Sequence, residues 1–195
     1  MKIESTGAKR GALYRRRQLL RLGGALGLCT LGSAVFAQVT RPQVSIKRDL
    51  DMLHLHTTEQ IDLIFSVDQQ YLPPALGKLD YFLRDHYSND VGRMDPRLYD
   101  FMYQIRRDTG GRRAFEIISG YRSPVTNEHL RTSRGGGVAR RSLHMDGQAI
   151  DLRLPGVPLA QLRDAAIAQQ LGGVGYYSRD GFVHIDTGRV RTWGS

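Results

Sequence analysis

The sequence predicts one α+β domain, in which a small antiparallel sheet carries helices packed on one side. Short apolar segments with alternating inward and outward positions indicate the strands. Longer segments with apolar residues three or four positions apart indicate the helices. The chain has 195 residues, which is enough for one domain with a real core but hardly for two.

The first predicted elements are a β-hairpin and a helix. Residues 50–56 and 60–67 form the two strands of the hairpin, joined by the polar turn 57–59. Pro73-Pro74 then opens a helix, because the apolar residues that follow share one face at helical spacing. These residues are Leu76, Leu79, Phe82, Leu83 and His86.

A second helix is predicted to begin at Asp95-Pro96 and to end near Gly110-Gly111. Asp95 supplies the N-cap oxygen and Pro96 the pre-set first turn. The apolar stripe of this helix consists of Leu98, Phe101, Met102 and Ile105. Residues 114–118 follow as a short buried strand.

The segment 119–148 has a different character. It is rich in Gly, Ser and Arg and lacks sustained periodicity, so we expect a long irregular segment, which in compact domains tends to be functional. Regular structure returns as a strand at 149–154, a helix at 158–170 and a final strand at 182–186.

Residues 1–37 are predicted to be an export signal, and residues 38–195 the mature domain. The basic stretch Arg15–Arg17 precedes an apolar run that extends from Leu22 to Phe36, and Ala37 suits signal peptidase. The run is short for a membrane-spanning helix, which needs roughly 20 residues. An uncleaved membrane anchor is the alternative.

The order Arg16-Arg17-Gln18-Leu19-Leu20-Arg21 resembles the twin-arginine export pattern. We therefore expect a periplasmic protein that meets the membrane only during export. The one cysteine, Cys29, lies in the apolar run, so the mature chain has neither disulfides nor thiolate metal ligands. A metal ion in it must be held by His, Asp or Glu.

The net charge of +9 and the pI near 10.0 would alone suggest a nucleic-acid-binding protein. Residues 1–37, however, hold seven of the 28 basic residues and one of the 19 acidic residues. The rest of the chain has 21 basic and 18 acidic residues, a net charge of +3. That is an ordinary soluble surface, and we expect no nucleic-acid partner.

Two segments carry candidate metal ligands. Asp151 points away from the core in the strand that starts at residue 149, and Gly147 permits a sharp turn that brings His144 over the same face. In the strand 182–186, His184 lies on the face away from the core. Two imidazoles and one carboxylate, with an open fourth position, are a catalytic zinc ligand set. On spacing alone, satisfied histidines of the core or surface remain the alternative.

Four motifs together resemble a known family. Residues 142–151, Ser-x-His-x-x-Gly-x-Ala-x-Asp, resemble the metal-binding signature of the LAS metallopeptidases, which include D-Ala-D-Ala carboxypeptidases and the hedgehog zinc domain. The murein endopeptidase K branch is the closer resemblance, and it covers essentially the whole mature chain. The segments that carry it are Ser119–Ser123 with Thr126-Asn127, Gly172–Tyr177, Phe182–Gly188 and the closing Arg191-Thr192-Trp193.

The resemblance implies a hedgehog/DD-peptidase-like zinc domain, with Zn²⁺ held by His144, Asp151 and His184. It implies that Arg122 holds the substrate or the developing oxyanion, a role that suits a guanidinium beside a metal. A surface arginine after a turn is the alternative. The implied activity is hydrolysis of peptide cross-links between peptidoglycan stems, by an enzyme that we expect to be a monomer.

The general base does not carry over from the family. Many LAS enzymes place Glu or Asp three residues before the last histidine, and Gly181 occupies that position here. The nearby carboxylates are Asp180 and Asp186. Strand alternation favours Asp186 as the catalytic base, and an equally open interpretation is that Asp186 orients a metal ligand.

Other candidates are weaker. His54 and His56, on one strand face, could bind a metal, although an exposed hairpin face is the better interpretation. His86 is expected near a helix end, and His129 in solvent. Four arginines around the glycines form either an anion-binding rim for a wall polymer or a solvated loop. They are Arg131, Arg134, Arg140 and Arg141.

Two other functions stay open at this point. A D-Ala-D-Ala-type carboxypeptidase would use the same metal ligands. A non-hydrolytic, zinc-containing wall-binding module is favoured by the missing carboxylate at Gly181. The sequence leaves open which peptidoglycan bond is cut.

Overall fold

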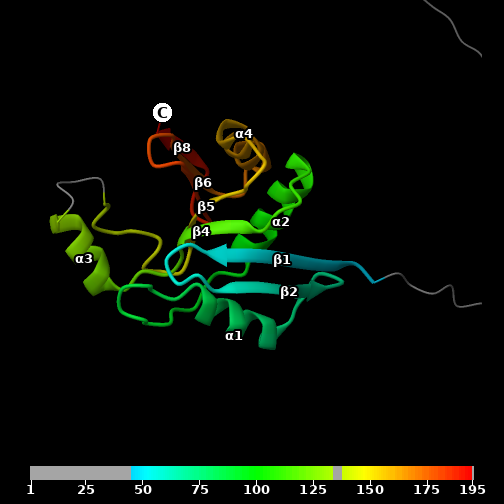
Figure 1. Cartoon of the computed structure of the whole chain (residues 1–195), viewed down its shortest axis with the longest axis horizontal. Coiled ribbons are helices and arrows are strands. Elements are labelled where there is room, and N and C mark those ends of the chain that lie inside the picture. Colours follow the sequence, from blue (N-terminus) through cyan, green and yellow to red (C-terminus); the bar gives the residue numbers. More distant parts are fainter. Residues whose placement is uncertain (1–44, 134–137, 195) are drawn as a thin grey trace, which may run out of the picture. The chain divides into compact units, whose positions relative to one another are not determined.

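The computed structural model describes residues 45–133 and 138–194 (Figure 1). The predicted export signal, Cys29 and Arg134 lie outside these ranges, so the proposed signal and its boundary stay predictions. No helix in the described ranges has the length and apolarity that crossing a membrane requires.

Eight strands and four helices make up the described chain. The strands are β1 (Lys47–His54), β2 (Gln60–Val67), β3 (Gln70–Tyr71), β4 (Phe115–Ser119), β5 (Ala149–Arg153), β6 (Gly173–Tyr177), β7 (Phe182–Asp186) and β8 (Arg191–Gly194). The helices are α1 (Pro73–Phe82), α2 (Arg97–Thr109), α3 (Pro124–Ser133) and α4 (Leu159–Gln169).

All eight strands belong to one sheet in the order β3-β2-β1-β4-β5-β7-β6-β8. The α+β class is confirmed, but the sheet is larger than expected and mixed, because β1 pairs with β4 and β6 with β8 in parallel. Parallel pairs need a connection that returns the chain to the same end of the sheet. The long segment with α1 and α2 does this for β4. Strand β7 does it for β8, and residues 187–190 then pass the start of β6 to reach the far side of that strand.

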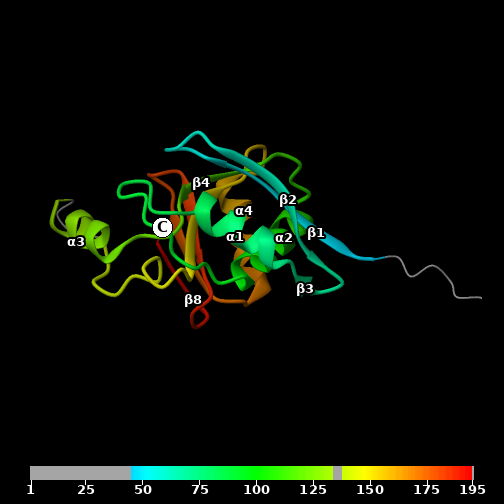
Figure 2. The same cartoon turned by 90° about the horizontal axis from the view of Figure 1, so that it is seen from below.

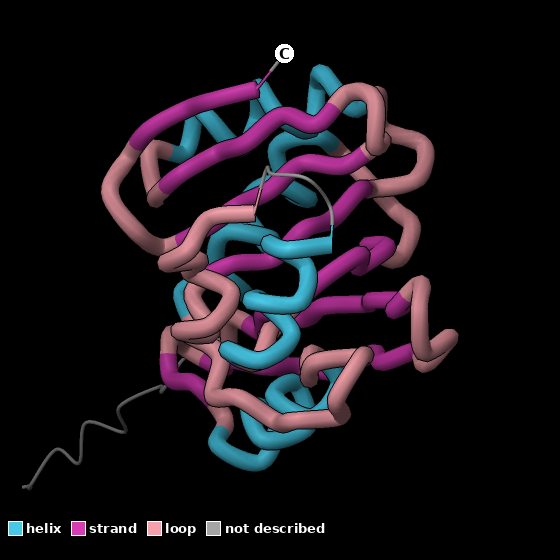
Figure 3. Tube along the Cα trace, turned by 90° about the vertical axis from the view of Figure 1, so that its left-hand side faces the viewer, coloured by secondary structure: helices cyan, strands magenta, loops and turns pink. Residues whose placement is uncertain are grey.

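The helices divide between the two faces of the sheet. Figure 2 shows α1, α2 and α4 on the inner side of the curved sheet, where they enclose the apolar core with residues such as Phe65, Leu98 and Ile150. Figure 3 shows that α3 lies in front of the opposite face. The metal-binding face expected opposite the helices therefore has a helix of its own beside it.

The predicted hairpin and second helix are confirmed. Strands β1 and β2 pair antiparallel, and α2 starts where Asp95 Oδ1 accepts a hydrogen bond from the backbone N–H of Arg97 at 3.0 Å. The helix ends at Gly110, whose φ of 66° is left-handed. The predicted strand and helix over 149–154 and 158–170 correspond to β5 and α4.

Three predictions about regular elements were wrong. Helix α1 ends at Phe82, short of His86. Helix α3 interrupts the segment expected to be irregular, and Ser123 caps it by accepting a hydrogen bond from the N–H of Thr126 at 3.2 Å. Ser-Pro at a helix start was the available signal. Strands β6 and β8 were missed because β6 is rich in glycine and β8 is short.

Candidate metal centre

A row of four paired residues crosses the centre of the sheet. Asp151 on β5 pairs with His184 on β7, His184 pairs with Gly175 on β6, and Gly175 pairs with Trp193 on β8. Paired residues on neighbouring strands share a face. Asp151 and His184 therefore project side by side from the face away from the core, as their alternation predicts.

The turn before β5 places the third residue, His144, over the same face. Gly147 has a φ of +66°, and a Cβ on it would lie 2.0 Å from the carbonyl oxygen of Arg93. Only glycine fits this turn without a shift of the backbone. The N–H of Gly147 bonds the carbonyl of His144 at 3.3 Å, which closes the turn that brings the imidazole back toward β5. The predicted role of Gly147 is confirmed.

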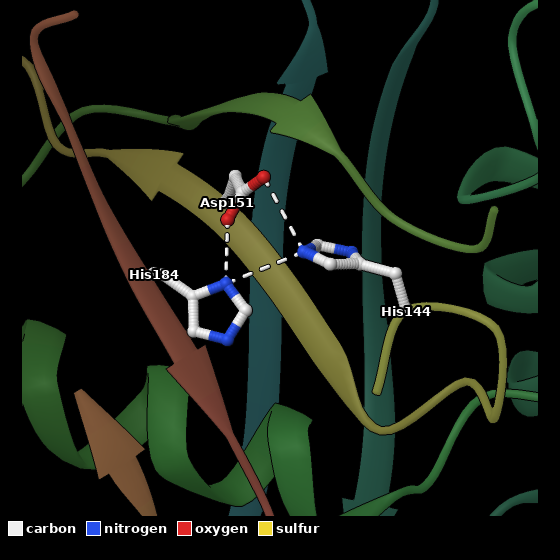
Figure 4. A group of neighbouring side chains, drawn as sticks. All are labelled: His144, Asp151 and His184. Atoms are coloured by element: carbon white, nitrogen blue, oxygen red, sulfur yellow. Dashed lines mark hydrogen bonds and ion pairs between the residues drawn. The ribbon is translucent and has the colours of Figure 1, made fainter. Parts of the chain in front are cut away.

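Three potential ligand atoms converge from these elements (Figure 4). His144 Nε2 lies 3.3 Å from His184 Nδ1 and 3.3 Å from Asp151 Oδ2, and His184 Nδ1 lies 2.7 Å from Asp151 Oδ1. A tetrahedral ion with bonds of about 2.0–2.1 Å keeps its ligand atoms roughly 3.3 Å apart. The trio therefore fits a metal ion. Within residues 45–133 and 138–194, it is the one group of three such side chains that could hold one.

Hydrogen bonds on the far nitrogens set which atom of each imidazole faces the trio. The Nδ1–H of His144 donates to the carbonyl of Gly120 at 2.7 Å, which leaves Nε2 as the free acceptor. His184 Nε2 lies 3.3 Å from Asp186 Oδ2, so the tautomer that carries its proton on Nε2 leaves Nδ1 able to bind a metal. Such bonds fix the tautomer and ring orientation that a metal ligand needs.

The surroundings of Asp186 favour the orienting role over that of catalytic base. Its side chain is 0% exposed, and Arg191 donates to both of its oxygens, at 3.0 and 2.7 Å. The backbone N–H groups of Gly173 and Gly188 donate to Oδ1 at 3.1 and 2.8 Å. A carboxylate so enclosed has no open path to a substrate, and its remaining interaction is with His184.

The electrostatics of the trio favour a cation. Burial works against ionisation of Asp151, yet His144 and His184 hold the pKa of its carboxyl well below the usual range. Burial likewise disfavours a charged His184, but its bonds to Asp151 and Asp186 raise its pKa to about 9. Burial lowers the pKa of His144 despite Asp151. Two buried carboxylates thus attract positive charge to the ligand atoms.

The trio lies in a cleft of about 830 Å³ whose lining comes from both sides of β5 and β7. Arg122 and Ser119 from the end of β4 lie on one side of the trio, and β6 and β8 lie on the other. Arg122 Nη2 is 3.3 Å from Ser119 Oγ and 3.9 Å from Asp151 Oδ2. The other candidate base, Asp180, also lines this cleft and is exposed.

The remaining histidines fall into different environments. His54 and His56 do not share an exposed face, since β1 ends at His54 and His54 is 0% exposed. His86 lies in the loop beyond α1 and stacks on His56, with ring centroids 4.1 Å apart. Both His56 and His86 line the cleft. His129 is exposed on α3, as expected.

The predicted basic rim is only partly at the cleft. Arg141 lines it, whereas Arg131 is exposed on α3 and pairs with Glu128 at 2.6 Å. Arg140 is also exposed. Three aromatic side chains without a predicted role line the cleft beside His184. They are Tyr177, Phe182 and Trp193.

A mixed α+β domain with a His-Asp-His cluster of this geometry, open to a cleft, is of the metallopeptidase class. The chain belongs to the Peptidase_M15_2 family, described as peptidoglycan L,D-endopeptidase MepK, whose family model matches residues 43–193. The murein endopeptidase K resemblance is thereby confirmed.

Two curated relatives illustrate the match. The chain is 44% identical over 179 residues to peptidoglycan L,D-endopeptidase MepK of Escherichia coli (strain K12), which covers 91% of this chain and 96% of the relative. It is 43% identical over 180 residues to the probable peptidoglycan L,D-endopeptidase MepK of Haemophilus influenzae, which covers 91% and 95%.

Proposed function

We propose that the protein is an exported, zinc-dependent endopeptidase that hydrolyses L,D peptide bonds in the cross-links of peptidoglycan. The observation that carries the proposal is the convergence of His144, Asp151 and His184 in a cleft, within a chain of this peptidase family. The relatives, which are named L,D-endopeptidases, supply the bond type.

Zinc is the metal that this donor set suits best. Two imidazoles and one carboxylate in tetrahedral spacing match the three protein ligands of catalytic zinc sites, which leave one position open. When bound, the metal supplies the Lewis acidity that activates water and polarises the carbonyl to be attacked. One chain provides all three ligands, so a monomer suffices.

The chain's own side chains have separate tasks in this mechanism. The carbonyl of Gly120 and the carboxylate of Asp186 hold His144 and His184 in their ligating orientations. Arg122, 3.9 Å from Asp151, offers its guanidinium to the carbonyl oxygen, where negative charge develops. Asp180, the exposed carboxylate of the cleft, is better placed than Asp186 to exchange a proton with the substrate.

The shape of the cleft supports endopeptidase over carboxypeptidase action. Lining residues lie on both sides of the trio, from β4 and the loop after α1 on one side and from β6 and β8 on the other. A substrate bound there extends in both directions from the bond that is cut. A carboxypeptidase needs room for one terminal residue on one side.

Digestion of purified muropeptides by the mature, zinc-loaded protein tests the proposal. Mass spectrometry should show each cross-linked dimer converted to two monomers, with one water molecule taken up for each bond cut. Release of a terminal D-Ala alone would indicate the carboxypeptidase. Retention on the wall without any product would indicate the binding module.

Export is tested separately. Because the first 37 residues have the basic–apolar–small order of a signal, protein from the periplasmic fraction should begin at Gln38. Replacing Arg16 and Arg17 by Lys should block export if the twin-arginine route is used. Unchanged export of that variant would point to the general secretory route.

A further inference from the structure

The wall of the cleft beyond His184 is aromatic. Tyr177 on β6, Phe182 on β7 and Trp193 on β8 all line the cleft, and we call these three residues the aromatic platform. The rings of Tyr177 and Phe182 stack with centroids 4.6 Å apart. The ring of Trp193 lies 5.2 Å from that of His184, so the platform directly adjoins the metal centre.

The glycines of β6 make room for this platform. A Cβ on Gly175 would lie 2.6 to 2.8 Å from three atoms of the Trp193 indole. The indole therefore packs directly on the backbone of β6, in the space a side chain would take. Gly173 makes the same space for Arg191, whose guanidinium lies 2.4 Å from the position of a Cβ there. The two glycines of β6 are therefore required by the side chains of Arg191 and Trp193, which pack directly on them.

Two further contacts fix the indole in place. Trp193 Nε1–H donates to the hydroxyl of Tyr177 at 3.0 Å. On the other side, the guanidinium of Arg191 lies 4.7 Å from the Trp193 ring and is anchored to Asp186 at 2.7 Å. A ring held by partners of this kind loses little conformational entropy when it binds a ligand. All three aromatic side chains of the platform are partly exposed.

Partly exposed aromatic faces bind aliphatic groups, which in peptidoglycan come either from amino-acid side chains or from sugar rings. The location of the platform decides between them. It lies on β7, β6 and β8, the strands that follow β5 across the sheet, and its Trp193 ring is beside His184, so whatever it holds adjoins the bond that is cut. In peptidoglycan, stem residues separate the sugars from the cross-link.

We propose that Tyr177, Phe182 and Trp193 form a subsite that holds the aliphatic side chain of the amino-acid residue next to the bond that is cut. This subsite rests on the proposed function and adds a determinant of its specificity. The methylene groups of a long, unbranched side chain would lie along the indole and phenyl faces. A residue as short as alanine would leave these faces uncovered.

The test compares two glycan-free cross-linked peptides, one with its natural diamino residues and one in which alanine replaces the residue that supplies the carbonyl group of the cut bond. We expect the wild type to prefer the long side chain about tenfold in kcat/KM, the order of one aromatic contact. Trp193→Ala should lose most of this preference, mainly through KM. Trp193→Phe keeps an aromatic face and should restore most of it.

Tyr81→Ala is the matched control, since Tyr81 is 56% exposed and does not line the cleft. It should keep the full preference. Zinc content should be measured for every variant, because a substitution that disturbs His184 would lower it. An unchanged preference in Trp193→Ala, or a lower kcat at unchanged KM, would overturn the subsite. A loss confined to substrates that carry the disaccharide would overturn it in favour of a sugar platform.

The chain offers a direct readout of binding as well. Trp193 is its single tryptophan, so intrinsic fluorescence reports on the platform alone. Glycan-free peptide should shift the emission, and N-acetylglucosamine oligomers should leave it unchanged; the reverse pattern would contradict the subsite. Wild-type protein that cleaves no muropeptide would refute the proposed function itself, which is a different result from a lost side-chain preference.

Discussion

Two histidine clusters lie at the same cleft and differ in their electrostatics. His144 and His184 face Asp151, and hydrogen bonds to Asp151 and Asp186 raise the pKa of His184 to about 9, against the effect of burial. At the other end, His56 and His86 line the cleft and His54 is buried beside them, without a carboxylate in direct contact. Burial lowers the pKa values of His54 and His86 to about 4. The first cluster attracts a cation, and the second lacks the negative charge to do so.

The geometry of the second cluster explains why it is not a metal site. His54 Nδ1 accepts hydrogen bonds from the backbone N–H groups of His56 and Thr57, at 3.3 and 3.5 Å. Its Nε2 is buried with no hydrogen-bond partner among the described residues. His56 and His86 stack with their planes 1° apart, so their lone pairs do not converge on a common point. The difference between the clusters teaches that ligand atoms converging on one point, and not the number of histidines, distinguish the candidate metal centre.

The largest effect should come from removing a ligand of the first cluster. His144→Ala and His184→Ala should each lose bound zinc, because two remaining protein ligands hold a catalytic metal weakly. Muropeptide turnover should then fall by about 10³-fold or more. Elemental analysis measures the bound zinc, and product chromatography measures the turnover. His56→Ala, in the second cluster, should keep its zinc; full metal content in either ligand variant would refute the assignment.

The next largest effect is expected at Asp186. A substitution there distinguishes a residue that orients a metal ligand from one that transfers a proton. If Asp186 orients His184, Asp186→Asn should weaken zinc affinity by about 10- to 100-fold. If it is instead the base, the variant should keep its zinc affinity and lose rate by roughly 10²–10⁴-fold. We expect the first result from a competition titration with a chelator. Asp180→Asn is the paired variant, and it should lower the rate at unchanged zinc affinity.

A smaller effect is expected in the second cluster, as a pH dependence of the free energy of unfolding. Because the pKa of His54 falls from 6.5 to about 4 on folding, the unfolded chain binds more protons between these values. Its contribution to stability is therefore complete above about pH 6.5 and declines as the pH falls toward 4, by about 1–3 kcal/mol. Urea unfolding across this range should show that wild type loses stability relative to His54→Leu as the pH falls. Parallel curves would contradict the assignment.

The smallest effect is expected at the one described histidine outside both clusters. His129 is exposed on α3, so His129→Ala should change the free energy of unfolding by less than about 0.5 kcal/mol. Zinc content and turnover should match the wild type. A clear loss of turnover would mean that α3 takes part in substrate binding.

The placement of the candidate metal ligands was predictable because it depends on local rules. Strand alternation gives the directions of Asp151 and His184, and Gly147 permits the turn to His144. The role of Asp186 was not predictable from alternation, because Arg191, which saturates it, comes from a strand that the sequence pattern does not reveal. The aromatic platform was not predicted for the same reason, because it depends on the parallel pairing of β6 with β8.

The alternation pattern of the sequence also predicted the wrong environment for His54. Spacing of two puts His54 and His56 on one face only while the strand continues, and β1 ends at His54. Helix α1 likewise stops at Phe82, where the chain turns into a loop that Asp85 ties down by accepting from the N–H groups of Tyr87 and Ser123, at 2.9 and 2.8 Å. Such ends are set by tertiary partners, which a one-dimensional pattern does not contain.

The register of β7 gives the metal centre a second consequence, for the making of the protein. A slip of one position would turn His184 and Asp186 into the core together and expose Val183 and Ile185. A chain in the slipped register would keep His144 and Asp151 but lose His184 and its partner Asp186 in one step. A metal ion that needs all three ligands would therefore bind the correctly paired sheet more tightly than a mispaired one, and would stabilise the native register of β7.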